Sequence, residues 1–185
     1  IDLPSEMKGK VPNREYMNKL HGRYGWSTGA MLNISIGQGE ILVTPIQMAA
    51  YTNLLATRGV AKNLHLVSPK NDSQFTGSST VSSNTWDIIH NSMKQVVYGK
   101  KGTGKLSNPN IPGVTVSGKT GTAENPHGET HAWYIGFANY KDEDMISVVV
   151  LVENGGGGGS VASPIARKIF KEYNDNINYE LTRAQ

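Results

Sequence analysis

Three stretches between residues 114 and 152 have the residue pattern of β-strands. From Val114 apolar and polar residues alternate, and from His131 to Ala138 one set of alternate positions carries Trp133, Ile135 and Phe137. This period of two is typical of strands with one buried face. The run 145–152 is apolar and rich in β-branched residues, as expected of a strand buried on both faces. The charged segment 141–144 lies between the last two stretches and suits a short turn, so these stretches are expected to pair as a hairpin.

Helical patterns lie on both sides of these stretches. Thr44 and Gln47 flank Pro45 as in a capping box, and apolar residues then recur at spacings of three and four until Gly59. A second helix is expected from about residue 85 to 98, and a third over 160–175, whose apolar side would cover the sheet. The chain is therefore predicted to have an α+β fold, with an antiparallel sheet of at least three strands flanked by helices.

The length of 185 residues suits one domain, 1–185. Residues 1–43 are expected to be irregular, because glycines and prolines interrupt any long period. Residues 44–106 would be a helical portion with a Ser/Thr-rich loop at 71–85, residues 113–153 the strands, and residues 160–175 the C-terminal helix. The glycine run 155–159 resembles a flexible linker, but it joins a strand to a helix within one packed unit and is expected to be a native turn.

Composition excludes several kinds of site. The absence of cysteine excludes disulfides, thiolate metal sites and a cysteine nucleophile. His127 and His131 lack the spaced carboxylates of a metal site, so we expect no metal and no cofactor and assign both to solvated or hairpin-stabilising roles. The net charge of +3 is scattered, so nucleic acid is not an expected partner. No apolar run is long enough to span a membrane, and the start at Ile1 without Met leads us to expect an excised piece.

One glycine-rich motif has two interpretations. Gly113, Gly118, Lys119 and Thr120 have the spacing of a phosphate-binding P-loop, which needs a strand before its first glycine and a helix that begins at the Lys-Thr pair. Here two prolines closely precede Gly113 and helix-breaking residues follow Thr120, while the strand pattern lies inside the motif. Both flanks argue against a P-loop.

The other interpretation places Lys119 on a strand whose edge lines a cleft. A cation and hydroxyl groups there can receive a substrate carboxylate, and Gly121 lets a substrate backbone approach closely. A free backbone N–H just after the glycine can serve as an oxyanion-hole donor. The Lys- and Gly-rich segment 100–105 is expected to be either a solvated loop or a flap near this cleft, and Trp86 and Trp133 are expected in the core.

Longer segments around the motif resemble the transpeptidase domain of penicillin-binding proteins. Lys119-Thr120-Gly121-Thr122-Ala123-Glu124 and His131-Ala132-Trp133-Tyr134-Ile135-Gly136-Phe137-Ala138 are similar to the third active-site motif of that family and the strand after it. Segments 1–4, 35–49, 153–155 and 162–166 are also similar to family segments. The resemblance is to class B transpeptidases of the cell-elongation type, and it implies the C-terminal part of the penicillin-binding-protein and serine β-lactamase-like fold.

The resemblance also implies a reaction. The family cross-links peptidoglycan: a serine attacks a D-Ala-D-Ala peptide, releases the terminal D-Ala and passes the acyl group to an amine, and penicillins acylate the same serine. Lys119 and Thr122 would be catalytic, the first in the proton-transfer network and the second as an oxyanion donor. The substrate-binding residues would be Ser117, Thr120, Gly121 and Thr122, with the threonine hydroxyls on the substrate carboxylate.

Partners and location follow from the same resemblance. The expected partners are the peptidoglycan stem peptide, β-lactam antibiotics and membrane proteins of cell elongation. The expected location is the extracytoplasmic, periplasmic face of the bacterial cytoplasmic membrane, with an anchor outside this chain.

Two further motifs of the family, Ser-x-x-Lys with the nucleophile and Ser-x-Asn, are expected to lie outside this chain. Ser5 and Lys8 match the first only in letters, because Pro4 and Gly9 disfavour the helix that would bring them together, and Ser82-Ser83-Asn84 lies in the polar loop. The chain alone is therefore predicted to be inactive, and an unpaired sheet edge predicts dimerisation. Two other hypotheses are a P-loop nucleotide-binding protein and a non-catalytic domain with the same fold.

Overall fold

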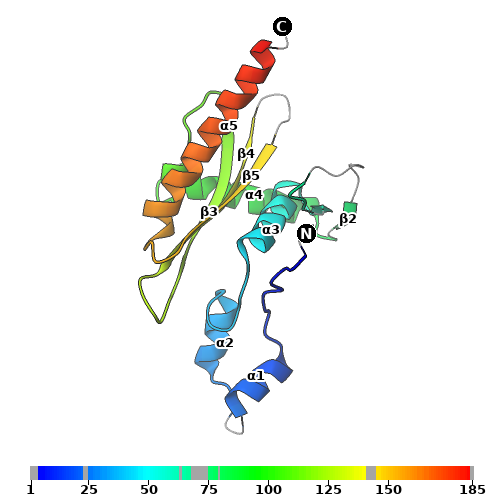
Figure 1. Cartoon of the computed structure of the whole chain (residues 1–185), viewed down its shortest axis with the longest axis vertical. Helices are drawn as coiled ribbons and strands as arrows, with labels where there is room; N and C mark the ends of the chain where they lie inside the picture. The colour runs from blue at the N-terminus through cyan, green and yellow to red at the C-terminus, as the bar shows by residue number, and fades with distance from the viewer. Residues whose placement is uncertain are drawn as a thin grey trace.

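The computed structural model describes residues 4–22, 25–62, 64–67, 75–78, 80–140 and 145–183. Helices and strands form an α+β arrangement (Figure 1). A 3₁₀ turn, Lys105–Ser107, precedes β3, and a π-helical turn, Gly158–Ala162, precedes α5. The main elements in chain order are α1 (Arg14–His21), α2 (Thr28–Ser35), α3 (Pro45–Ala56), β1 (Val60–Lys62), β2 (Phe75–Ser78), α4 (Ser83–Tyr98), β3 (Thr115–Ala123), β4 (His131–Asn139), β5 (Met145–Val152) and α5 (Ser163–Arg183).

The strands β3, β4 and β5 form one antiparallel sheet in that order. β3 pairs with β4 along its whole length, from Thr115 opposite Asn139 to Ala123 opposite His131. β5 pairs with the other edge of β4, so β3 and β5 are the outer strands. The predicted antiparallel sheet is confirmed, whereas the turn predicted at 141–144 lies outside the described residues.

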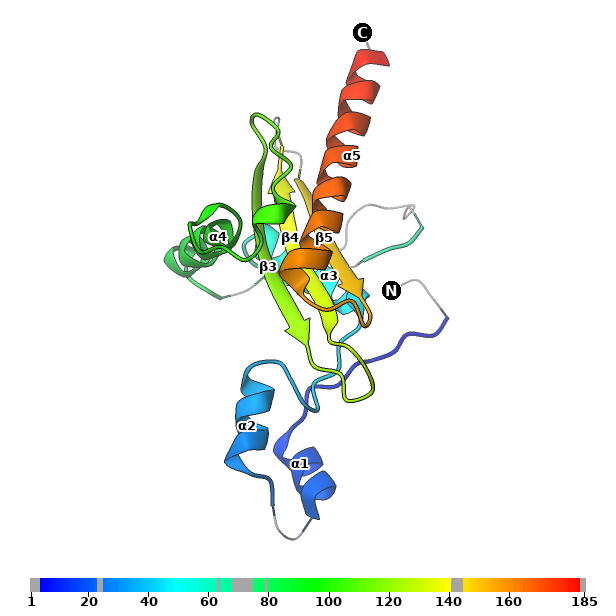
Figure 2. The ribbon, with the colours of Figure 1, turned by 90° about the vertical axis from the view of Figure 1, so that its left-hand side faces the viewer.

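Helices cover both faces of this sheet (Figure 2). On one face, Tyr134 of β4 packs in an apolar core with Phe170 of α5. On the other face, Phe137 of β4 packs in a second core with Leu55 of α3 and Trp86 of α4. Alternate positions of β4 thus point into different cores, as the period of two predicts. The core position predicted for Trp86 is confirmed, since it is 6% exposed.

Tyr134 occupies the centre of the sheet beside two glycines. Gly118 and Gly136 lie opposite each other on β3 and β4, and a Cβ atom at either position would overlap the Tyr134 hydroxyl. This hydroxyl donates to Ser107 Oγ over 2.9 Å. Burial raises the pKa of the Tyr134 hydroxyl well above its ordinary value. The glycine before Lys119 therefore makes room for a buried tyrosine.

Side-chain caps define where α3 and α4 begin. Both hydrogen bonds of the predicted capping box are present: Gln47 N–H donates to Thr44 Oγ1 over 3.3 Å, and Thr44 N–H donates to Gln47 Oε1 over 3.0 Å. Ser82 caps α4 by accepting from Thr85 N–H over 3.3 Å. Ser82-Ser83-Asn84 is thus the start of a helix, which gives these residues a structural role.

The expectation that residues 1–43 are irregular is wrong where α1 and α2 form. Asn13 and Ser27 cap these helices by accepting from the amides of Tyr16 and Ala30. Gly22 and Gly37 follow the two helices at φ of 60° and 80°, where glycine is favoured. These glycines therefore end helices instead of preventing them.

Two other boundaries differ from the prediction. β2 lies inside the predicted Ser/Thr-rich loop. It forms by pairing with β1, a partner that a local sequence pattern does not reveal. α5 continues to Arg183, beyond the predicted end at residue 175, and its last turns extend past the sheet (Figure 2). Apolar spacing marks only the part of a helix that contacts a core.

The helices α1 and α2 lie apart from the sheet, below it in Figure 1. Lys10 and Leu42 exchange backbone hydrogen bonds of 2.7 and 2.9 Å. Gln47 Nε2 also donates to the Lys8 carbonyl over 2.8 Å. These contacts hold the segment before α1 against the segment before α3, and neither Ser5 nor Lys8 lies in a helix.

The glycine run after β5 is a native turn, as predicted. A Cβ atom at Gly158 would overlap the carbonyl oxygens of Gly121 and Trp133. A Cβ atom at Gly159 would lie 2.6 Å from the Thr103 carbonyl oxygen. At Gly158 and Gly159 the turn packs so closely against β3, β4 and the loop before β3 that side chains are excluded.

Candidate active-site cleft

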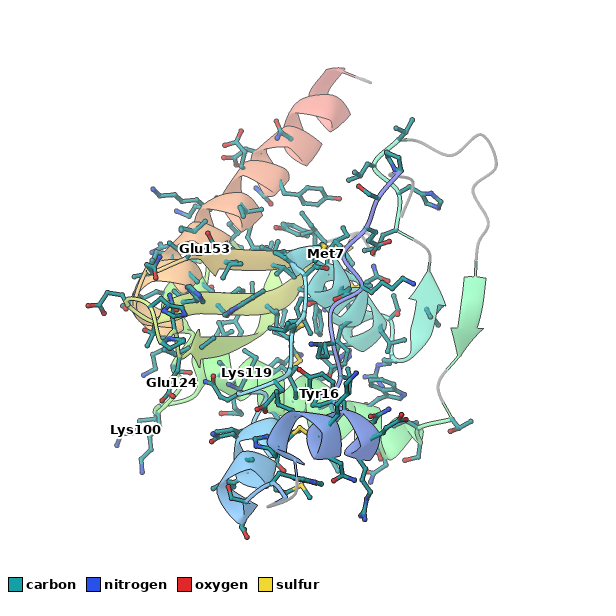
Figure 3. All side chains as sticks on the ribbon, turned by 60° about the horizontal axis from the view of Figure 1, so that its bottom comes forward. Met7, Tyr16, Lys100, Lys119, Glu124 and Glu153 are labelled. Atoms are coloured by element: carbon teal, nitrogen blue, oxygen red, sulfur yellow. The ribbon has the colours of Figure 1, made fainter. Side chains whose placement is uncertain are left out.

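A cleft of about 530 Å³ lies between β3 and the chain that connects α2 to α3. One wall contains Gln38 and Met48, and the other contains residues 119–123 of β3 with Trp133 and Ile135 of β4. Figure 3 shows Lys119 on β3 and Glu124 just beyond its end, on the side that faces α1 and α2. The Lys-Thr-Gly motif therefore lines a cleft.

Lys119 and the two threonines alternate between the faces of β3, as its strand pattern predicts. Lys119 is exposed, lies opposite Ile135 and donates from Nζ to the Thr120 carbonyl. Thr120 Oγ1 lies 2.7 Å from Thr103 Oγ1, and Gly158 N–H donates to Thr122 Oγ1 over 3.5 Å. Because β3 is an outer strand, its edge brings side chains of both faces to the same cleft.

Gln38 contacts the free edge of β3 directly. Its Nε2 donates to the Thr122 carbonyl over 3.1 Å, and its Oε1 accepts from Glu124 N–H over 3.3 Å. The Thr122 carbonyl therefore points away from β4. Since the N–H and C=O of one strand residue point to the same side, the Thr122 N–H also points to the free edge. This direction is the one that an oxyanion donor at Thr122 requires.

Gly121 and Trp133 lie opposite each other where the cleft meets the sheet. A Cβ atom at Gly121 would lie 3.2 Å from Trp133 Cβ. The core position predicted for Trp133 is wrong, because this side chain is only half-buried and lines the cleft. The face of β4 that carries Trp133 is covered at Phe137 by the core with α3 and α4. Near the start of β4 the same face opens toward the cleft.

Ser117, a predicted substrate-binding residue, is buried and is not among the residues that line the cleft. Its side chain is 0% exposed, and in the described structure its Oγ has no hydrogen-bond partner. It stands opposite Phe137, the residue that packs beneath α3 and α4. Helices therefore cover Ser117, although it is only two positions from Lys119.

Both histidines near the motif take part in hydrogen bonds within the connections between strands, His131 through its imidazole and His127 through its backbone N–H. Asn154 N–H donates to His131 Nδ1 over 2.9 Å, which links the chain after β5 to the start of β4. His127 N–H donates to Asn125 Oδ1 over 3.0 Å. Within the ranges that the structure describes, no three His, Asp or Glu side chains cluster as metal ligands would.

The P-loop interpretation is wrong. A phosphate-binding loop places its Lys-Thr pair at the N-terminus of a helix, where backbone amides face the anion. Here Lys119 and Thr120 lie in the interior of β3, and β3 leads through a turn into β4. The amides of the motif belong to a strand.

Two residues of the site, Gln38 and Thr103, were missed in the sequence. Gln38 stands between two glycines, a signal of a tight turn that does not reveal what the turn contacts. Thr103 lies in the glycine-rich segment 100–105, which reaches Thr120 through the hydroxyl contact at 2.7 Å. Only their contacts with β3 identify both residues as part of the site.

An antiparallel sheet between helices, with a Lys-Thr-Gly motif on an outer strand that lines a cleft, defines the class of penicillin-binding enzymes and serine β-lactamases. Within this class, the chain belongs to the penicillin-binding protein transpeptidase domain family, whose model matches residues 1–171. It is 31% identical to the peptidoglycan D,D-transpeptidase MrdA of Haemophilus influenzae over 94% of this chain. The match spans 30% of that relative's length.

Two solved structures are similar at the level of the backbone. PBP2 of Pseudomonas aeruginosa, in complex with WCK 5153, has a TM-score of 0.74 and 32% identity, over 94% of this chain and 40% of that one. PBP2 of Helicobacter pylori, in complex with MreC, has a TM-score of 0.72 and 30% identity, over 94% of this chain and 32% of that one. The predicted fold class is confirmed by these similarities.

Proposed function

We propose that the protein to which this chain belongs is a peptidoglycan D,D-transpeptidase, a penicillin-binding protein of the elongation class. The observation that carries the proposal is the free edge of β3, where Lys119, the hydroxyls of Thr120 and Thr122, and the Thr122 N–H lie along one cleft. Membership of the transpeptidase family and the similarity to MrdA support the same reaction.

In the proposed reaction a serine oxygen attacks the carbonyl carbon of the peptide bond between two D-Ala residues. The C–N bond breaks, the terminal D-Ala leaves with a proton on its nitrogen, and an acyl-serine ester forms. An amine of a neighbouring stem peptide then attacks the ester. The cross-link forms, and a proton of the amine returns to the serine oxygen.

Residues of β3 supply charge and hydrogen bonds to this reaction. The Lys119 ammonium stabilises negative charge near the nucleophile and takes part in proton transfer. The Thr122 N–H donates to the carbonyl oxygen as it becomes an oxyanion. The hydroxyls of Thr120 and Thr122 donate to the terminal carboxylate of the peptide. Gly121 leaves room for the peptide backbone beside Trp133.

The nucleophilic serine is proposed to lie outside this chain. Ser5 and Lys8 are in non-helical chain, so they lack the spacing that a helical Ser-x-x-Lys motif provides. Ser82 is engaged as the cap of α4. We therefore expect this chain alone to form no acyl-enzyme.

The test compares this chain with the complete protein after incubation with a labelled penicillin, with intact mass as the readout. We expect one label on the complete protein and none on this chain. In the complete protein, Lys119→Ala should slow labelling by at least roughly 100-fold, whereas Lys168→Ala, at an exposed position of α5, should leave the rate unchanged. A folded complete protein that takes no label would refute the proposal, and a label on Ser5 would refute the placement of the nucleophile.

Partners and location are proposed on the same basis. We assign the protein to the extracytoplasmic face of the membrane, with peptidoglycan stem peptides, β-lactams and membrane proteins of cell elongation as partners. The Helicobacter pylori relative supports the last of these, since its structure is a complex with MreC. Among the helices in the described part of the chain, none has both the length and the hydropathy of a membrane span.

A further inference from the structure

The turn between α2 and α3 presents one side chain, Gln38, to the opposite wall of the cleft. Gly37 and Gly39 flank it at φ of 80° and 71°, in the left-handed region that favours glycine. Gln38 N–H donates to the Asn33 carbonyl over 2.8 Å, and Gly37 N–H donates to the Ile34 carbonyl over 3.0 Å. The turn is thus tied to the end of α2, and its geometry depends on both glycines.

The Gln38 carboxamide makes the two hydrogen bonds that two successive peptide groups of an added strand would make. A strand that joins the edge of a sheet donates to its carbonyls and accepts from its amides. Gln38 does both, to the Thr122 carbonyl and from the Glu124 amide, over 3.1 and 3.3 Å. A primary carboxamide directs an N–H donor and a C=O acceptor to the same side, whereas the N–H and C=O of one trans peptide group point to opposite sides. The edge of β3 is therefore already occupied at the point where the cleft would receive a peptide.

We propose that Gln38 is a specificity-determining residue that closes the edge of β3 to ligands without an extended peptide backbone. A peptide offers a donor for the Thr122 carbonyl and an acceptor for the Glu124 amide, so it exchanges two hydrogen bonds for two when it displaces Gln38. A ligand with only a carboxylate or an amine replaces one bond and leaves the other group unpaired. The choice of a peptide as the displacing ligand rests on the proposed function.

The first arm of the test requires no catalysis and uses this chain. In Gln38→Glu, a protonated carboxyl group donates to the Thr122 carbonyl and accepts from the Glu124 amide, as the carboxamide does. The carboxylate that forms above the ordinary glutamate pKa of about 4.3 cannot donate and repels that carbonyl. Amide hydrogen exchange at Glu124, corrected for the intrinsic rate, reports whether the edge is closed.

We expect Gln38→Ala to lower the protection of the Glu124 amide roughly tenfold, whereas Gln38→Glu should stay protected at about pH 4 and at about pH 7, because its carboxyl oxygen accepts in both ionisation states. The unaltered chain should stay protected at both pH values, and Gln38→Ala should be unprotected at both. The charged groups near residue 38 are Lys119 on β3, Glu124 just after β3, and Glu40 on the turn, whose Oε1 lies 3.6 Å from His21 Nε2. All four are present in every variant. Equal protection in the three proteins would overturn the closed edge.

The second arm tests displacement with an N-acylated tripeptide that ends in D-Ala-D-Ala. Backbone amide resonances of residues 119–122 report binding, and the Nε2 protons of Gln38 report displacement. Both sets should change with one Kd, and Gln38→Ala should bind the tripeptide about tenfold more tightly. Free D-Ala, which has no peptide backbone, should also bind Gln38→Ala more tightly than the unaltered chain, because the edge is open only in the variant.

The outcomes separate the two proposals. Binding at residues 119–122 with an unchanged Gln38 carboxamide, or weaker binding by Gln38→Ala, would overturn the role of Gln38 and leave the proposed function standing. A tripeptide that fails to bind even Gln38→Ala, whose edge is open, would contradict both the peptide as the ligand and the exchange that Gln38 is proposed to control.

Discussion

Gly118 is the residue at which one added methyl group should have the clearest effect on stability. A Cβ atom there would overlap the Tyr134 hydroxyl, which is buried and held by Ser107. We expect Gly118→Ala to lower the free energy of unfolding by about 1–3 kcal/mol, as overpacking in a core does. Urea unfolding measures the change. Gly29→Ala is the control, because its Cβ would meet only Ser27 Oγ at 3.5 Å, and a similar loss in both variants would contradict the packing role of Gly118.

Tyr134 also makes stability depend on alkaline pH. Burial raises the pKa of its hydroxyl above the ordinary value of 10.0 in the folded state, while the unfolded chain keeps that ordinary value. The unfolded state therefore loses this proton first, so the stabilisation is complete below the ordinary pKa and is lost as the pH rises above it. We expect Tyr134→Phe to weaken the fall of the unfolding free energy above about pH 10. Tyr140, whose pKa is also raised by burial, should keep part of this dependence of the unfolding free energy on pH. The same pH dependence in the variant and in the unaltered chain would contradict the prediction.

At the scale of elements, the glycine turn before α5 distinguishes a native connection from a flexible linker. A Cβ atom at Gly158 would overlap two carbonyl oxygens of the β3–β4 pair, whereas one at Gly157 would lie 3.1 Å from Ser160 Oγ, a side chain that can move. We expect Gly158→Ala to cost about 1–3 kcal/mol of unfolding free energy and Gly157→Ala less than about 1 kcal/mol. Urea unfolding of the two variants makes the comparison. A linker would tolerate both changes equally.

The elements differ in how far local sequence predicts them. The capping box of α3 and the alternation in β4 are complete within a few residues, and both were predicted correctly. α1 and α2 were missed because glycines were interpreted as breakers, although Gly22 follows the end of α1 and Gly29 lies inside α2. β2 was missed because its partner β1 lies in another part of the chain. An element that depends on a distant partner leaves only a weak local pattern.

At the scale of the whole molecule, the outer edge of β5 has consequences for association. Among the described strands β5 pairs only with β4, and all of its residues except Ser147 are apolar. Open apolar edges pair with further strands. We expect this chain to dimerise through β5, so that its mass in light scattering rises with concentration from 20.0 kDa toward twice that value. A mass that stays at the monomer value at all concentrations would contradict the prediction.

Local pattern was sufficient for the sheet, for the helices α3 and α4, and for the rejection of a phosphate-binding loop. Each depends on residues within one strand or one helical turn, where side-chain spacing reflects the exposure of neighbouring positions. The cleft itself depends on contacts through space. Gln38 bonds to residues 84 and 86 positions away, Trp133 faces the cleft, and Ser117 is covered by helices although it neighbours the motif. No short-range period carries such information, because the position of a distant wall follows only from how the elements pack.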